Sequence, residues 1–368
     1  MSPLLNEIRE LIAHEGPISI ERYMALCLGH PRHGYYMTRD PFGQAGDFTT
    51  APEISQMFGE LIGVWAASVW QQMGAPAALR LVELGPGRGT LMADALRAAR
   101  SLPAFRAALD VRLVEMSPVL RTTQERTLAG CGVPITWHPG LEEIDEGAPL
   151  IVIANEFFDA LPIRQAQFRD GGWRERLVGL DAAGALTFGL SGEAVSMPPV
   201  TGSEGDIREF CPAAMAIAGT LAGRLRREGG ALLAIDYGYA VPQPGDSLQA
   251  LRTHRFSDVL ADPGDADLTA HVDFSALASA ARAAGALAHP LLTQRTLLER
   301  LGILARAGAL ARARPDQAGV IETALNRLTG AGPEAMGTLF KALCVSAPTL
   351  PAPAAFDSPD PLIAHISG

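Results

Sequence analysis

Three glycines at alternate positions follow an acidic residue in the segment RLVELGPGRGTLMADAL, residues 80–96. The acid is Glu83, and the glycines are Gly85, Gly87 and Gly89. Glycine permits backbone angles that other residues avoid, and it lets backbone amides approach a ligand closely. An apolar run precedes this turn and a helical pattern follows it, so the segment predicts a strand, a turn and a helix that together bind a nucleotide-like cofactor. A tight turn with nothing bound is the alternative.

The spacing of the glycines discriminates between cofactors. In the dinucleotide-binding fingerprint the third glycine follows the second by three positions, and here that position is Thr90. The motif ELGPGRG instead resembles the first motif of class I S-adenosylmethionine (SAM) methyltransferases. A second acid, Glu115, ends the next predicted strand in LVEMSP. A carboxylate there can accept hydrogen bonds from both ribose hydroxyls, and a surface acid that closes a strand is the alternative.

Polar residues also end the fourth predicted strand, in IANEFFDALPIRQ. Ligands of open α/β sheets bind beyond the carboxyl ends of the strands, so we expect Asn155, Glu156 and Asp159 to face the reactive end of the cofactor. Two carboxylates there would orient a cationic methyl acceptor such as a guanidinium. NEFF also loosely resembles the Asn-Pro-Pro-aromatic motif of amino-methylating DNA enzymes, which bind a flipped base, but both prolines are missing. An acidic loop that caps the next helix is a further alternative.

The scaffold is predicted by short apolar runs that alternate with helical patterns from residue 79 onward. Such runs favour buried strands of βαβ units in a largely parallel sheet. They cover residues 80–84, 110–116, 133–137, 149–155, 230–238, 286–292 and 339–347. Between residues 163 and 190, two turn signals separate alternating runs and predict inserted β-hairpins. The predicted fold class is therefore α/β.

Three regions are expected along the chain. Residues 1–75 read as a helical layer, with helical patterns at 4–15, at 18–28 and from about 52 to 74. Residues 76–348 read as the α/β domain, with an inserted region at 163–206 and helices at 293–335. Residues 349–368 are rich in proline and are expected to lie irregularly on the surface.

Composition excludes several classes of protein. The 368 residues carry a formal net charge of −10, which disfavours a protein that coats nucleic acid. The N-terminal residues lack the pattern of a secretory signal, and no apolar segment is long enough to span a bilayer. The four scattered cysteines favour reduced thiols over disulfides or zinc, and we expect no metal site. These features predict a cytoplasmic protein that neither binds nucleic acid nor inserts into a membrane.

Longer motifs resemble the MidA family, whose mitochondrial member is the arginine methyltransferase that assists assembly of respiratory complex I. The resemblance runs from about residue 3 to residue 346, and the motifs occur in the same order. They are DPFGQAGDFTTAPEISQMFGELIGVW, LVELGPGRGTLMAD, LVEMSPVLR, ANEFFDALPIRQ, IDYGY, GDSLQALRTHRF, DLTAHVDF and MGTLFKAL.

The resemblance implies a class I methyltransferase core, Rossmann-like with a mostly parallel seven-stranded sheet, and SAM as the cofactor. It implies a protein arginine as the substrate, in mitochondria one that is symmetrically dimethylated in the 49-kDa subunit of complex I. The chain starts at its first helix, without the presequence of the mitochondrial members, and this favours a bacterial homologue in the cytoplasm.

The resemblance also implies roles for individual residues. Glu83 and the three glycines would lie along SAM, Glu115 would hold its ribose, and Asn155 and Glu156 would lie at the site of methyl transfer. The expected lid over SAM, within GDFTTAPE, consists of Gly46, Asp47, Phe48 and Thr49.

Two further motifs, IDYGY and HVDF, supply the candidate substrate-binding residues Asp236, Tyr237 and His271. Asp236 ends the fifth predicted strand on the reactive side of the sheet. His271 would accept a proton or cap the helix that starts near Phe274, and a structural role is equally expected for each residue. Two other functions stay open: an assembly chaperone with a vestigial SAM pocket, and a nucleic-acid amino-methyltransferase.

Overall fold

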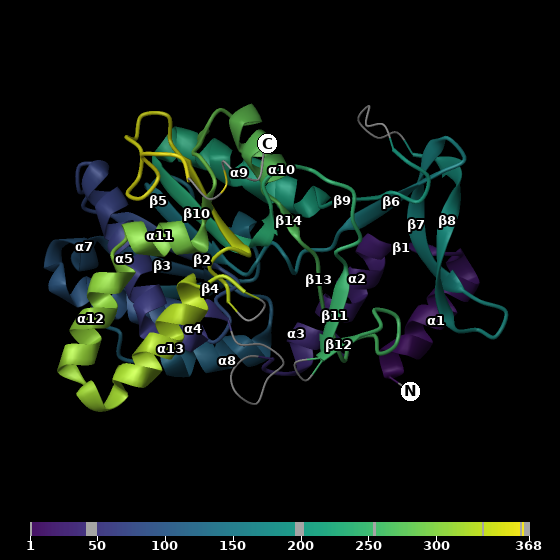
Figure 1. Cartoon of the computed structure of the whole chain (residues 1–368), viewed down its shortest axis with the longest axis horizontal. Coiled ribbons are helices and arrows are strands. Elements are labelled where there is room, and N and C mark those ends of the chain that lie inside the picture. Colours follow the sequence, from purple (N-terminus) through teal and green to yellow (C-terminus); the bar gives the residue numbers. More distant parts are fainter. Residues whose placement is uncertain are drawn as a thin grey trace.

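The computed structural model describes residues 2–41, 50–195, 202–252, 255–332, 335–360 and 363. Figure 1 shows a larger lobe built on one twisted sheet and a smaller lobe that contains the N-terminus. Neighbouring strands of the large sheet are, in order, β15(Leu287–Ala288), β17(Phe340–Ser346), β10(Gly230–Tyr239), β5(Leu150–Asn155), β2(Leu79–Leu84), β3(Leu109–Val114) and β4(Ile135–His138). Two short strands extend it, β14(Val272–Asp273) beside β10 and β16(Leu292–Thr293) beside β17.

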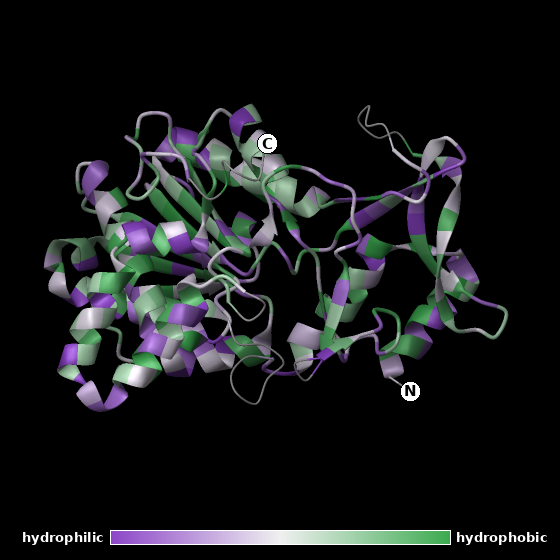
Figure 2. Cartoon of the chain, in the orientation of Figure 1, coloured by the Kyte–Doolittle hydropathy of each residue, from purple (hydrophilic) through white to green (hydrophobic). Residues whose placement is uncertain are grey.

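The core of this sheet is parallel, as the alternating pattern predicts. Strands β10, β5, β2, β3 and β4 pair with one another in parallel, whereas β17 runs antiparallel to β10. All six residues of β5 are buried. Ile151 and Ile153 belong to one hydrophobic cluster and Leu150 and Val152 to another, so the sheet is covered on both faces. Figure 2 shows these strands largely in the hydrophobic colour.

Helices cover both faces of the sheet. The cluster on one face includes residues of α5(Gln56–Gln72), α6(Thr90–Ala98), α7(Pro103–Ala108), α11(Gln294–Arg300), α12(Ile303–Ala313) and α13(Ala318–Thr329). The cluster on the other face includes residues of α9(Pro212–Glu228) and α10(Phe274–Ala283). The helix α8(Pro118–Thr127) connects β3 to β4.

Helices α5 and α6 approach closely through two glycines of α5. A Cβ atom at Gly63 would lie 2.7 Å from the Cα atom of Ala95, and one at Gly59 would lie 2.6 Å from the Cβ atom of Asp94. Because α6 begins directly after the glycine turn, this contact fixes the helix on which the turn depends.

The smaller lobe combines three separate stretches of the chain. Its hydrophobic cluster contains residues of α1(Pro3–Glu15), α2(Ile20–Gly29) and α3(Tyr35–Thr38), together with Val178 and Leu268. A five-stranded sheet holds β1(Ile18–Ser19), β7(Gly172–Leu180), β6(Arg164–Arg169), β9(Ile207–Phe210) and β8(Leu186–Ala194). A three-stranded sheet holds β12(Arg255–Ser257), β11(Gln249–Arg252) and β13(Asp267–Thr269). The inserted hairpins predicted from the sequence are therefore present, as β6–β7 and β7–β8.

The N-terminal helices differ from the expected single layer, because they divide between the lobes. Helices α1 to α3 pack in the smaller lobe, whereas α5 packs on the large sheet. The helix expected from about residue 52 to 74 is interrupted at Ser55, whose extended backbone separates α4(Ala51–Ile54) from α5. Ser55 then caps α5 by accepting a hydrogen bond from the amide of Met57.

Two other expectations need correction. The run 286–292 forms the short strands β15 and β16 rather than one strand, because Pro290 lies between them and has no amide to donate to a ladder. The segment 351–360 has no helix or strand, as expected, but it does not lie wholly on the surface. Phe356 is 1% exposed and belongs to the core of the large lobe. No helix within the described ranges is long and apolar enough to cross a membrane.

Candidate active site

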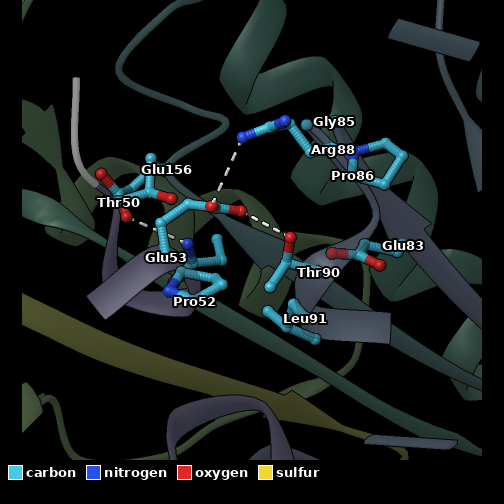
Figure 3. A pocket seen from close by; sticks show the side chains of 12 residues that line it. Thr50, Pro52, Glu53, Glu83, Gly85, Pro86, Arg88, Thr90, Leu91 and Glu156 are labelled. Carbon is cyan, nitrogen blue, oxygen red and sulfur yellow. Dashed lines mark hydrogen bonds and ion pairs between the residues drawn. The ribbon is translucent and has the colours of Figure 1, made fainter. Parts of the chain in front are cut away.

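A cavity lies where β2 and β5 end, between the glycine turn and the short helix α4 (Figure 3). Strands β2 and β5 are neighbours and run parallel, so the residues that follow them meet at one edge of the sheet. The cavity is lined by Thr50, Pro52, Glu53, Glu83, Gly85, Pro86, Gly87, Arg88, Thr90, Leu91, Asn155 and Glu156.

The glycine turn adopts the backbone conformation that its sequence predicts. Gly85, Gly87 and Gly89 have φ angles of 60°, 52° and 80°, in the left-handed region that side chains disfavour. A Cβ atom at Gly85 would also lie 3.0 Å from the ring of Phe157. Gly85 and Gly87 line the cavity, whereas Gly89 caps the start of α6.

Glu83 is an almost completely buried acid at the wall of the cavity. Its side chain is 2% exposed, and its Oε2 atom has no hydrogen-bond partner among the described residues. Burial raises the pKa of this carboxyl to about 8. A buried polar atom without a partner is costly unless a ligand satisfies it.

Glu156 follows β5 in a strained turn. Its φ angle is 50°, a region that non-glycine residues rarely occupy and that is often found at functional sites. Its Oε1 atom accepts hydrogen bonds from the amide of Ala51 and from Nδ2 of Asn155, each at 3.1 Å. Burial raises the pKa of Glu156 to about 8. The Oδ1 atom of Asn155 is buried without a partner in the described part of the chain.

Asp236 holds the turn that carries these residues. Its Oδ2 atom accepts hydrogen bonds from the backbone amides of Phe157, Phe158 and Asp159, at 3.2, 3.0 and 3.2 Å. Its Oδ1 atom accepts one from the amide of Tyr237 at 3.1 Å, and the side chain is fully buried. Of the two roles considered for Asp236, contact with substrate and a structural role, these hydrogen bonds favour the structural one.

Asp159 lies next to this anchor but does not line the cavity. It is 7% exposed, and its Oδ1 atom has no partner within the described ranges. Burial raises the pKa of Asp159 to about 6, and the hydroxyl of Tyr237 lies close enough to oppose this shift through a hydrogen bond. Asp159 therefore presents a buried acceptor beside Glu156.

Tyr237 and His271 lie together, with ring centroids 5.4 Å apart. Burial lowers the pKa of His271, which favours its neutral imidazole. The capping role considered for His271 belongs to Asp273, which accepts a hydrogen bond from the amide of Ala276 at the start of α10. His271 instead lines a second cavity, which it shares with Phe158 and Tyr239 among others.

Glu115 does not line the first cavity either, but a hydrogen-bonded network connects it to the glycine turn. Its Oε1 atom accepts from the amide of Ser117 at 2.7 Å, and its Oε2 atom accepts from the side-chain amide of Gln124 at 2.9 Å. Gln124 also donates to the carbonyl of Gly87 at 2.7 Å. Burial raises the pKa of Glu115 to about 7, and these hydrogen bonds oppose the shift.

Sequence reasoning missed the residues that connect α4 to the glycine turn. Oε1 of Glu53 accepts a hydrogen bond from the hydroxyl of Thr90 at 2.5 Å, and its Oε2 atom lies 3.8 Å from Nη1 of Arg88 (Figure 3). Arg88 also pairs with Asp40, at 3.3 Å. The position of Arg88 inside the glycine motif was the available signal for such a contact. The expected lid residues Gly46, Asp47, Phe48 and Thr49 lie outside the described residues.

The cavity fits a nucleoside-bearing ligand. It combines a turn in which alternate residues lack a side chain, left-handed glycines, and a carboxyl oxygen of Glu83 without a partner in the described ranges. Within the described ranges, no group of three or more His, Cys, Asp or Glu side chains is placed to hold a metal ion.

Comparisons with known proteins agree with this geometry. Residues 61–291 match a family model described as S-adenosyl-L-methionine-dependent methyltransferase. The chain is 37% identical to "Protein arginine methyltransferase NDUFAF7 homolog, mitochondrial" of Drosophila melanogaster, over 93% of this chain and 84% of that protein. It is 38% identical to the Homo sapiens protein arginine methyltransferase NDUFAF7, over 84% and 76%.

A solved structure is similar over almost the whole chain. It is a COG1565 superfamily member from Burkholderia thailandensis bound to S-adenosyl-homocysteine, with a TM-score of 0.84 and 30% sequence identity. The similarity covers 96% of this chain and 94% of that one. The α/β methyltransferase fold expected from the sequence is therefore confirmed, as is SAM as the cofactor. Together these findings place the chain in the MidA (COG1565) family of SAM-dependent methyltransferases.

Proposed function

We propose that this methyltransferase transfers the methyl group of SAM to an arginine side chain of a protein. The observation that carries the proposal is the pair of buried acids after β5: Glu156, which lines the cavity, and Asp159, three residues further along the same turn. The names of the Drosophila and human relatives, protein arginine methyltransferases at 37% and 38% identity, support the same acceptor.

In this proposal the cofactor contacts the glycine turn. Glu83, Gly85, Gly87 and Gly89 would lie along SAM, and Glu115 would accept hydrogen bonds from the hydroxyls of its ribose. When bound, SAM supplies an electrophilic methyl group on a sulfonium. Glu115 uses one lone pair of each oxygen for Ser117 and Gln124, so each oxygen retains a site for a ribose hydroxyl.

The carboxylates of Glu156 and Asp159 bind and orient the acceptor. Both have raised pKa values because they are buried, about 8 and about 6. A guanidinium between them would favour their ionised forms and lower both pKa values, since opposite charges attract strongly where water is excluded. The two side chains would hold the guanidinium in one orientation, and an ionised carboxylate would accept the proton that its reacting nitrogen loses. Asn155 contributes an unsatisfied oxygen to the same wall.

The neighbouring residues complete the proposed acceptor site. Tyr237 would border it because its hydroxyl hydrogen bonds to Asp159. His271 would border it because its ring contacts the ring of Tyr237. Asp236 acts indirectly, by holding the turn that carries Glu156 and Asp159.

The family resemblance suggests the target. We propose a protein substrate that belongs to respiratory complex I, or a similar protein, and a place of action in the cytoplasm of a bacterium. The formal net charge of −10 supports a protein rather than a nucleic acid as the partner.

Mass spectrometry of methylated arginines, in cells with and without this gene, tests the proposal. The proposal is supported if an arginine loses its methyl groups only in the deletion strain. The unaltered gene should restore these methyl groups, and the Glu156→Gln gene should not. Such an arginine would also identify the target protein. Methylation lost only from nucleic acid, or from another type of side chain, would refute it. The Glu156→Gln chain is expected to bind SAM but to transfer no methyl group. If this chain fully rescued the cellular phenotype, the result would favour an assembly chaperone over an enzyme.

A further inference from the structure

One buried side chain joins the glycine turn to Glu115. Gln124, on α8, is 0% exposed, and its Nε2 atom donates to the carbonyl of Gly87 at 2.7 Å and to Oε2 of Glu115 at 2.9 Å. Its Oε1 atom accepts a hydrogen bond from the indole nitrogen of Trp137 at 2.9 Å. All three contacts reach groups from different elements: the glycine turn, the end of β3 and strand β4.

The orientation of this amide follows from the chemistry of its partners. An indole nitrogen can only donate, so the group that faces Trp137 must be the oxygen of Gln124. The two hydrogens of the amide then point to a carbonyl and a carboxylate, which can only accept when the acid is ionised. No other assignment of the amide satisfies all three partners.

We propose that Gln124 is a positioning residue for the cofactor, which sets the distance between the glycine turn and the carboxylate of Glu115. The inference rests on the proposed role of Glu115 at the ribose. Without Gln124, the half-buried carbonyl of Gly87 and one oxygen of Glu115 would each lose a hydrogen-bond donor, and each would move toward water or another donor. A turn and an acid that bind two parts of one ligand must keep a fixed separation, and binding weakens when that separation varies.

Calorimetric titration with S-adenosylhomocysteine tests the proposal without methyl transfer. Gln124→Leu removes all three hydrogen bonds at nearly constant volume, and we expect it to weaken binding about tenfold or more. Gln294→Leu is the matched control, because Gln294 is also 0% exposed and donates to the carbonyl of Leu328, at 2.9 Å, away from the cavity. The control loses one hydrogen bond rather than three, so we expect it to lower the melting temperature less and to change binding less than about twofold.

A ligand that lacks one hydroxyl separates the two contacts of Gln124. Gln124→Leu should weaken binding of the 2′-deoxy analogue of S-adenosylhomocysteine less than binding of the complete ligand. The analogue lacks a hydroxyl that Glu115 would bind, so it has less affinity to lose when Glu115 is displaced. An equal loss for both ligands would contradict the link to Glu115. Unchanged affinity of Gln124→Leu, or an equal loss in Gln294→Leu, would overturn the proposal.

A second variant covers the case in which Gln124→Leu does not fold. Trp137→Phe removes only the donor that orients the amide, and it should weaken binding about two- to fivefold in a folded chain. Unchanged binding in Trp137→Phe, when Gln124→Leu is unfolded, would also overturn the proposal. Because no acceptor is present in these titrations, their outcome is independent of whether the acceptor is arginine.

Discussion

The backbone amide of Ala51 donates a hydrogen bond to Oε1 of Glu156 across 3.1 Å, although 105 positions separate the two residues. Ala51 begins α4, and Glu156 follows β5 on the large sheet. This donor opposes the rise in the pKa of Glu156 that burial causes. The N-terminal segment therefore influences the charge of an acid at the cavity wall, so the site is complete only when both segments are in place.

Glu156→Gln should separate binding from chemistry. The oxygen of glutamine can still accept the hydrogen bond from Ala51, so we expect the fold and the affinity for S-adenosylhomocysteine to change little. Methyl transfer should fall by about 100-fold or more, because the variant can neither pair with a cationic acceptor nor accept its proton. Incorporation of labelled methyl groups into protein measures the change. The control is Glu175→Gln, which breaks an ion pair with Arg164 in the smaller lobe and should retain methyl transfer. Normal methyl transfer by Glu156→Gln would exclude Glu156 from the reaction.

Glu83→Gln should change how stability depends on pH. The pKa of Glu83 is about 8 in the folded chain and about 4.5 when exposed, so the folded chain retains a proton that the unfolded chain releases between these values. The free energy of unfolding therefore falls as pH rises from about 4.5 to about 8, and it levels off above that range. Glu115 and Glu156 also have raised pKa values, so they too make the free energy of unfolding fall as pH rises. Glu83→Gln should therefore reduce this pH-dependent loss of stability rather than abolish it. Urea midpoints at pH 5 and pH 8 measure this, and an identical loss in both chains would show that Glu83 does not titrate in this way.

Asp236→Ala should destabilise the chain much more than an ordinary helix cap does. It leaves the buried amides of three consecutive residues without an acceptor, and we expect a loss of about 3 kcal/mol or more in the free energy of unfolding. Asp273→Ala removes the cap of α10 and should cost about 1 kcal/mol. Urea unfolding of both variants gives the comparison. Equal costs would indicate that Asp236 contributes no more than a local cap.

Gly63→Ala tests the close contact of α5 with α6. The new methyl group would meet the backbone of Ala95 at 2.7 Å, so the helices must separate, at a cost of about 1–3 kcal/mol. Gly219→Ala, inside α9, is the matched control, because nothing lies within 4 Å of its new methyl group. Alanine there should stabilise the helix by roughly 0.5–1 kcal/mol. Thermal unfolding should shift in opposite directions, and a shared direction would contradict the close contact.

Much of the large sheet could be predicted from the sequence, because parallel strands buried on both faces appear as short apolar runs. The runs 80–84 and 230–238 correspond to β2 and β10 within a residue. The glycine turn could be predicted for a related reason: few residues other than glycine tolerate its backbone angles. These are local properties of the chain, and neighbouring residues are sufficient to reveal them.

The orientations of buried polar groups could not be predicted in the same way. An acid at the end of a strand can face a ligand or the backbone, and only the packed turn shows that Asp236 faces three amides. Gln124 lies in RTTQERT, which reads as a solvated helix face, yet it is fully buried. The division of the N-terminal helices between two lobes likewise depends on partners more than 100 residues away, such as Val178 and Leu268.

The composition of the smaller lobe has a consequence for synthesis on the ribosome. The hydroxyl of Tyr23 bonds to the carbonyl of Val259, and 236 positions separate the two residues. At about 5–20 residues per second, roughly 10–50 seconds pass between the synthesis of these two partners. During that interval the apolar faces of α1 and α2 have no complete core to enter, so they should stay exposed on the nascent chain until about residue 270 has been made.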